Sequence, residues 1–230
     1  MLPSHLAGTA APGLVAGQPI AQWELGPMKN FVYLLIDWQA RRAALVDPQA
    51  DVSTPLEALR AHGLTLDRVL ITHTHFDHVA GLPALVRDRP ELTVVLHEAD
   101  LHRIEGVLHG RRPALVEDGQ AFGVGGLEVR ALHTPGHSAG HACYLVEGLE
   151  PPALLTGDTI FIRDCGRTDL DTGDDAAMFA SIQRVKALPP ETLILPGHHY
   201  RPEVASTVGR EREASPPFLA RSVEELAALP

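Results

Sequence analysis

One short segment holds most of the side chains that could bind a metal ion. The stretch THTHFDHVAG, residues 72–81, places three imidazoles and a carboxylate within six positions, at His73, His75, Asp77 and His78. Residues two apart in an extended segment point the same way, so His73 and His75 can converge on one point. Asp77 and His78 can aim at a neighbouring point. Neutral imidazole and carboxylate are the ligands expected for zinc or iron(II).

Three further candidates follow apolar runs later in the chain. His137 lies in HTPGHSAGH, Asp158 in LLTGDTIF and His198 in LILPGHHY. In each case a turn containing glycine separates the run from the candidate, and such turns present side chains at a sheet edge. Each candidate alone would be a weak signal, but together with the 72–81 segment they predict a metal centre. Three neighbouring histidines are expected to form hydrogen bonds beside it or to lie on the surface: His133, His141 and His199.

The elements that must position these residues alternate between strands and helices. The apolar pattern predicts strands at 31–37, 43–47, 68–72, 93–97, 142–146, 153–156 and 192–195, with short strands within 118–133. It predicts helices at 53–63, 79–89, 98–105, 174–187 and 203–212, and one last short helix in the tail 214–230. This order favours a layered α/β fold with sheets inside and helices outside. We expect a single domain over 1–230, with a core from about 20 to 213.

The composition excludes several classes of protein. A formal net charge of −10 disfavours nucleic acid and anionic membrane as partners, because phosphates would be repelled. The chain has only two cysteines, Cys143 and Cys165, which favours a reduced, cytoplasmic setting over a disulfide scaffold. The N-terminal segment lacks the pattern of a signal peptide, and no run of about 18 apolar residues predicts a membrane span.

The complete set of candidate ligands resembles the metallo-β-lactamase superfamily, and the resemblance runs from about 31 to 200. It implies an αββα sandwich, with two mixed β-sheets flanked by helices and the metals at one edge. It also implies two divalent ions, zinc first and iron as an alternative. By this resemblance the first metal is held by His73, His75 and His137. The second is held by Asp77, His78 and His198. Asp158 would bridge the two, and Asp77 could also orient the nucleophile.

The segments THTHFDHVAG, HTPGHSAGHACYLV and PGHHY further resemble glyoxalase II, the hydroxyacylglutathione hydrolase. This resemblance implies hydrolysis of a small-molecule thioester, such as a hydroxyacylglutathione, by a metal-bridging hydroxide, with Tyr200 near the thiol-bearing part of the substrate. Only 30 residues follow Tyr200, with few arginines and no lysine, whereas glyoxalase II has a longer basic C-terminal region. Another thioester, a lactone or another ester therefore stays open, as does the oligomeric state.

The segment FIRDCGRTDLDTGD, residues 161–174, resembles the persulfide dioxygenases, which act on glutathione persulfide. Their single iron would use only His73, His137 and Asp158, leaving positions open for dioxygen. Because the Cys-Gly-Arg core also occurs in glyoxalase II, thioester hydrolysis is the first hypothesis and the mononuclear iron enzyme is the alternative. A catalytically silent, metal-stabilised binding module is the third. An RNA-processing nuclease and a secreted β-lactamase are disfavoured.

Two residues of this segment could contact the substrate. Arg167 could bind a carboxylate through its planar guanidinium, or it could brace the loop. Cys165 could be a redox thiol, or it could pack within the loop.

Overall fold

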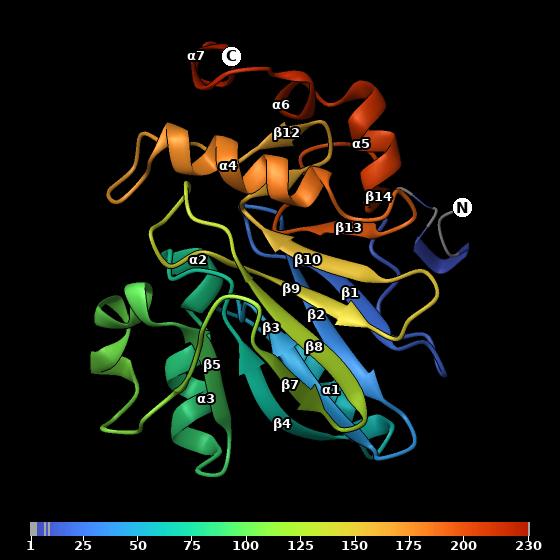
Figure 1. Ribbon diagram of the computed structural model, residues 1–230. Helices are drawn as coiled ribbons and strands as arrows, with labels where there is room; N and C mark the ends of the chain where they lie inside the picture. Colours follow the sequence, from blue (N-terminus) through green and yellow to red (C-terminus); the bar gives the residue numbers. More distant parts are fainter. Residues whose placement is uncertain (1–3, 7, 9, 230) are drawn as a thin grey trace.

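Two six-stranded β-sheets pack face to face, with helices on their outer sides (Figure 1). The computed structural model describes residues 4–6, 8 and 10–229. The first sheet contains, in spatial order, β1 (Ile20–Leu25), β2 (Asn30–Asp37), β3 (Arg42–Val46), β4 (Thr65–Leu70), β5 (Thr93–His97) and β6 (Ala114–Val116). The second contains β14 (Ser206–Thr207), β13 (Leu193–Pro196), β10 (Ala153–Gly157), β9 (Ala142–Glu147), β8 (Leu127–His133) and β7 (Ala121–Val124). A separate hairpin pairs β11 (Ile160–Phe161) with β12 (Asp164–Cys165).

The helices divide between the two sheets. The first half of the chain contributes α1 (Ser53–Ala61), α2 (Phe76–Val79), α3 (Leu82–Asp88) and the 3₁₀ turns η1 (Ser4–Leu6), η2 (Glu98–Arg103) and η3 (Glu105–Val107). The second half contributes α4 (Asp175–Lys186), α5 (Val208–Ala214), α6 (Pro216–Leu219) and α7 (Val223–Ala227). In Figure 1, α1 and α3 lie beside the first sheet, and α4 to α7 gather beyond the second.

Three hydrophobic clusters fill the spaces between these layers. Successive side chains of a strand point to opposite faces, so a strand buried on both faces reads as a continuous apolar run. In β2, Tyr33 and Leu35 enter the cluster between the sheets, whereas Val32 and Leu34 pack toward α1 and α3. A third cluster joins the second sheet to α4 and the helices after it. The αββα arrangement expected from the resemblance is confirmed.

Several predicted boundaries are wrong. The expected helix 203–212 begins only at Val208, because β14 pairs with β13 just before it and Thr207 caps the helix by accepting from the Arg210 backbone N–H. The expected helix 79–89 begins only at Leu82, as α3, because the preceding helix α2 ends at Val79 and Ala80 and Gly81 separate the two. A Cβ at Gly81 would lie 2.4 Å from the backbone oxygen of Gln49, so this close approach requires glycine.

The remaining differences are omissions. Strands β1 and β6 and the β11–β12 hairpin were not predicted, and the tail forms two short helices, α6 and α7, instead of one. Among the residues that the structure describes, no helix is long and apolar enough to cross a membrane.

Candidate metal centre and substrate pocket

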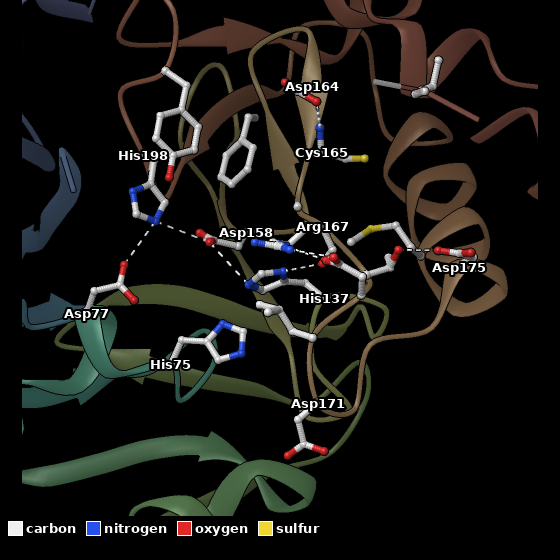
Figure 2. A pocket seen from close by; sticks show the side chains of 18 of the residues that line it. His75, Asp77, His137, Asp158, Asp164, Cys165, Arg167, Asp171, Asp175 and His198 are labelled. Atoms are coloured by element: carbon white, nitrogen blue, oxygen red, sulfur yellow. Dashed lines mark hydrogen bonds and ion pairs between the residues drawn. The ribbon is translucent and has the colours of Figure 1, made fainter. Parts of the chain in front are cut away.

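The seven candidate ligands all lie just after the ends of strands, and the structure brings them together at one edge of the two sheets. Figure 2 labels His75, Asp77, His137, Asp158 and His198 of this set. His73 and His75 come after β4, and Asp77 and His78 lie in α2, which starts directly behind them. The other three follow strands of the second sheet: His137 after β8, Asp158 after β10 and His198 after β13. The convergence therefore comes from the strand order, not from any one local turn.

The ligands form two clusters. In the first cluster, His73, His75 and His137 each offer one nitrogen, and these atoms lie within 4.8 Å of one another. The second cluster, consisting of Asp77, His78 and His198, meets the same limit. These two groupings match the ones that the family resemblance implies. A third group, consisting of Asp47, His73 and His78, meets the same distance limit.

Asp158 lies between the two clusters. Its Oδ2 is 3.5 Å from Nε2 of His137 in the first cluster and 3.4 Å from Nε2 of His198 in the second, and its Oδ1 is 3.4 Å from Nε2 of His78. One carboxylate therefore reaches both clusters, as a bridging ligand must.

The hydrogen bonds of the first cluster leave nitrogen lone pairs free to face a metal ion. The Nδ1–H of His137 donates to the backbone oxygen of Arg167 at 2.7 Å, and the Nδ1–H of His73 donates to Thr72 Oγ1 at 3.1 Å. Within the described part of the chain, the Nε2 atoms of both rings and Oδ1 of Asp158 are buried without a hydrogen-bond partner. Buried polar atoms are normally satisfied, and a ligating histidine normally donates its other N–H to an acceptor. The donor set thus fits a divalent metal ion.

Two residues that were not predicted as site residues, Asp47 and Asn30, form hydrogen bonds to the second cluster. Asp47 is buried at the end of β3, and its Oδ2 accepts from Nδ1 of His78 at 3.0 Å. The same carboxylate accepts from the backbone N–H and the hydroxyl of Thr72 at 2.8 and 2.6 Å. Asn30 donates to Asp77 at 2.8 Å. These hydrogen bonds orient His78 and Asp77 before any metal binds.

The two clusters differ in their protonation chemistry. Burial lowers the pKa of His73 well below its ordinary value, and burial together with the neighbouring imidazole of His137 lowers the pKa of His75 to about 4. Burial also opposes protonation of His198, but ion pairs with Asp158 and Asp77 raise the pKa of His198 to about 10.

The carboxyl groups are held in their ionised form. Burial alone would favour neutral Asp77, yet His198, His78 and Asn30 stabilise its charged form and lower the pKa of Asp77 to about 2. The pKa of Asp158 is also lowered, because the surrounding imidazoles outweigh its burial. Both carboxylates are therefore ready to bind a cation at neutral pH.

A second buried carboxylate, Asp100, joins the two ligand-bearing loops of the first cluster. Its Oδ2 accepts from the Thr74 backbone N–H at 3.1 Å and from Ser138 Oγ at 3.0 Å, and its Oδ1 accepts from the Gly140 N–H at 2.8 Å. Thr74 lies between His73 and His75, and Ser138 directly follows the third ligand of the cluster. Asp100 is thus a positioning residue of this cluster.

His141 has the hydrogen-bonding position expected for it. The ring is fully buried, accepts from the Asp158 backbone N–H at 3.0 Å, and lies 2.9 Å from Thr159 Oγ1. It also stacks on the ring of His73, with the ring centroids 5.2 Å apart. His141 therefore fixes the backbone of Asp158 and one side of the first cluster.

A pocket of about 970 Å³ opens over the two clusters. Figure 2 shows His75, Asp77, His137, Asp158 and His198 gathered around its base, with the β11–β12 hairpin beside them. The loop from 164 to 171 forms one wall, and residues of and beyond α7 close another side. The pocket gives a small molecule access to the candidate metal-binding residues.

Gly166 allows this loop to lie directly against the metal centre. A Cβ at this position would be 1.9 Å from the backbone oxygen of Asp158 and 3.0 Å from Nδ1 of His137. Only glycine fits such a contact, which gives a physical reason for the Cys-Gly-Arg sequence.

The three predicted substrate-binding residues all line the pocket. Nε of Arg167 lies 2.5 Å from Oδ1 of Asp169. The backbone oxygen of Arg167 accepts from the Nδ1–H of His137. Burial, reinforced by Asp164 and Asp175, raises the pKa of Cys165 to about 12, so its thiol stays protonated.

Tyr200 is half-exposed, and its ring stacks on that of His198 with centroids 4.8 Å apart. Burial and the nearby carboxylates raise the pKa of Tyr200 to about 12. It therefore presents a neutral hydroxyl and an aromatic face beside the second cluster.

Comparison with known proteins gives a consistent family assignment. The sequence profile of the metallo-beta-lactamase superfamily matches residues 25–198. A curated hydroxyacylglutathione hydrolase from Synechococcus sp. is 40% identical over 175 residues, which cover 74% of this chain and 65% of that protein. The chain thus spans slightly less than two thirds of that relative's length.

Two solved structures extend the similarity to most of the chain. ETHE1 from Myxococcus xanthus is 30% identical, with a TM-score of 0.79, over 93% of this chain and 92% of that one. TTHA1623, solved in a di-iron-bound form, is 32% identical, with a TM-score of 0.71, over 85% of this chain and 98% of that one. These matches confirm the resemblance inferred from the ligand pattern.

Proposed function

Because this chain belongs to the metallo-beta-lactamase superfamily, we propose that it is a dinuclear, metal-dependent hydrolase of thioesters, similar to glyoxalase II. The observation that carries the proposal is the pair of complete ligand clusters with Asp158 between them. The curated hydroxyacylglutathione hydrolases at 40% identity support thioester hydrolysis as the reaction.

The first cluster would hold one ion and the second cluster the other, with zinc as the first choice and Asp158 shared between them. Two divalent ions held together supply an activated water and polarise a substrate carbonyl. Asp77 stays ionised, so it can accept a hydrogen bond from the attacking water but cannot act as a general acid.

No strong acid is required for the leaving group. A thiol with an ordinary pKa of about 8.5 departs readily as a thiolate near neutral pH. Tyr200 remains protonated and can donate a hydrogen bond at the pocket mouth. Cys165 also remains protonated, so we assign it a packing role and not a nucleophilic one.

The alternative is a mononuclear iron persulfide dioxygenase that uses only His73, His137 and Asp158. Similarity to ETHE1 supports it, less strongly than the curated hydrolases support hydrolysis. In that case the second cluster would bind no catalytic metal.

The experiment that tests the proposal is a metal count combined with two assays. The protein is purified without added metal, the metal per chain is measured, and both S-lactoylglutathione hydrolysis and persulfide-dependent oxygen uptake are followed. We expect two metal ions per chain and hydrolysis without oxygen uptake. One iron per chain, with oxygen uptake and no hydrolysis, would overturn the proposal in favour of the alternative.

A further inference from the structure

Exposed hydrophobic side chains gather around the mouth of the pocket. Among the described residues, four of the seven large hydrophobic side chains that are exposed line it: Met28 at 39%, Phe76 at 71%, Leu170 at 37% and Tyr200 at 51%. They come from four separate segments of the chain. Single exposed apolar side chains are ordinary on a protein surface, whereas several around one pocket mark a binding surface.

The apolar surface continues from the mouth to the metal centre. The ring centroids of Phe161 and Tyr200 are 5.1 Å apart, and the ring of Tyr200 stacks on that of His198. Leu226 and Leu229 line the same pocket from the C-terminal side. A substrate with its carbonyl at the metal centre would therefore extend along apolar side chains.

Within residues 4–6, 8 and 10–229, every guanidinium group that lines the pocket is paired with a carboxylate. Apart from the proposed ligands, its lining contains two guanidinium groups and four carboxylates: Arg103, Arg167, Asp164, Asp169, Asp171 and Asp175. Arg103 pairs with Asp171 at 2.6 Å, and Arg167 pairs with Asp169 through two contacts of 2.5 and 2.6 Å. No lysine lines the pocket, so its wall has an excess of two carboxylates. This wall repels anionic groups.

We propose that the pocket takes thioesters with an uncharged, apolar acyl group on a carrier thiol that bears no phosphate. The inference rests on the proposed thioester hydrolysis and specifies its substrate class. A small hydroxyacyl group would leave the apolar mouth in water, whereas a longer alkyl or aryl group would cover it. The phosphates of a carrier such as coenzyme A would face the excess carboxylates.

The first test varies the acyl chain on one carrier. The metal-loaded protein is assayed with the acetyl, butanoyl and hexanoyl thioesters of glutathione. We expect kcat/KM to rise roughly threefold per methylene, somewhat less than the roughly fourfold (~0.8 kcal/mol) of complete burial, because the mouth is open to solvent. A kcat/KM that is constant or falls with chain length would overturn the inference.

Binding separates this inference from the proposed reaction. The S-methyl, S-butyl and S-hexyl thioethers of glutathione cannot be hydrolysed, so their Kd values report recognition alone. We expect Kd to fall by a similar factor per methylene. If Kd falls with chain length but no thioester is hydrolysed, only the proposed function is contradicted. If thioesters are hydrolysed but neither kcat/KM nor Kd depends on chain length, only the inference is contradicted.

Matched variants locate the apolar contact. Leu170→Ala and Phe76→Ala should each reduce the dependence of kcat/KM on chain length. Leu219→Ala is the control, because Leu219 is 53% exposed but does not line the pocket. If kcat/KM of both pocket variants depends on chain length as strongly as that of the unmodified chain, the apolar mouth does not bind the acyl group.

The carrier is tested with one acyl group on three thiols. We expect the butanoyl thioester of coenzyme A to have a kcat/KM about tenfold or more below those of glutathione and uncharged N-acetylcysteamine, with the gap narrowing at high salt. The double variant Asp169→Asn/Asp171→Asn would leave Arg103 and Arg167 without their carboxylate partners. It should therefore also reduce the difference in kcat/KM between coenzyme A and the other two carriers. Equal rates for coenzyme A and N-acetylcysteamine at low salt would overturn the exclusion of phosphate-bearing carriers.

Discussion

The first cluster contains only imidazoles, whereas the second contains a carboxylate and ion-paired histidines. Burial keeps His73 and His75 of the first cluster neutral, while Asp77 and Asp158 favour the protonated form of His198 in the second. His73 and His75 of the first cluster can therefore bind a cation without losing a proton. In the second cluster, His198 must release its proton before it can bind a metal ion. We therefore expect metal binding at the two clusters to differ in its pH dependence.

The clusters also differ in what positions them. Asp100 joins the two loops of the first cluster by accepting from Thr74, Ser138 and Gly140. Asp47 orients the second cluster through Nδ1 of His78. Substitution of Asp100 should therefore perturb mainly the first cluster. Substitution of Asp47 should perturb mainly the second, with a smaller effect on the first through Thr72, which accepts from His73.

The largest effect is expected from the residue that the clusters share. Asp158→Asn removes a negative charge that both metals need, so hydrolysis should fall by a factor on the order of 10³ or more. The measurement is kcat together with the metal content of the purified variant. Asp67→Asn, at a surface ion pair with Arg42, is the control and should keep both. No hydrolysis by the unmodified chain, together with a variant that loses only stability, would instead support the catalytically silent, metal-stabilised binding module.

A smaller and selective loss is expected from Asp47→Asn. An amide has only one accepting side-chain atom, so either the Thr72 backbone N–H or the Nδ1–H of His78 loses its acceptor, and the position of His78 is loosened. Metal affinity of the second cluster should fall roughly 10- to 100-fold, with a smaller decrease at the first, which Asp47 contacts only through Thr72. Stepwise titration with zinc, followed by calorimetry, separates the two affinities. An equal loss at both clusters would show that the bracing is not selective.

Asp100→Asn should produce the opposite selectivity. One of the backbone N–H groups that it now satisfies would lose its acceptor, which costs about 1–3 kcal/mol and loosens the first cluster. The same titration should show the weaker binding at the first cluster only.

Glu211→Gln is the matched control for this variant. Glu211 is equally buried and accepts from Arg163 and Ser206, away from the metal centre. It should lower the Tm while leaving both metal affinities unchanged. If Asp100→Asn behaves in the same way, Asp100 is only a structural residue.

The smallest effect is a difference in proton release. Near pH 7, His75 with a pKa of about 4 is already neutral, whereas His198 with a pKa of about 10 carries a proton. Raising the pH from 6 to 8 should therefore strengthen binding at the second cluster and leave the first nearly unchanged. Calorimetry in buffers of different ionisation enthalpy measures the protons released at each step. Equal release at both steps would remove this distinction between the clusters.

The candidate ligands could be recognised in the sequence because each follows a strand end within a short pattern. Their division into two clusters with Asp158 between them came from the family resemblance. His73 to His78 lie in one segment, and His137 and His198 each follow a Pro-Gly turn. The layered fold was predictable for a related reason: strands buried on both faces are continuous apolar runs, as in β2.

The bracing residues were not predictable, because their partners are far away in sequence. Asp47 contacts His78 across 31 positions, and Asp100 contacts Gly140 across 40. An isolated aspartate at a strand end carries no signal of such a contact, although the strand-end position of Asp47 matches that of the ligands. The helix predicted at 203–212 failed similarly, since the pairing of Ser206 and Thr207 with β13 overrides their local preference.

The dinuclear proposal is tested most directly by the metal content and hydrolytic rate of His198→Ala. This substitution removes one ligand of the second cluster and leaves the first cluster and Asp158 in place. We predict that metal content falls from two ions per chain to one, and that thioester hydrolysis falls by a factor on the order of 10³. One metal per chain in both proteins, with the variant as active as the unmodified chain, would contradict a dinuclear hydrolase.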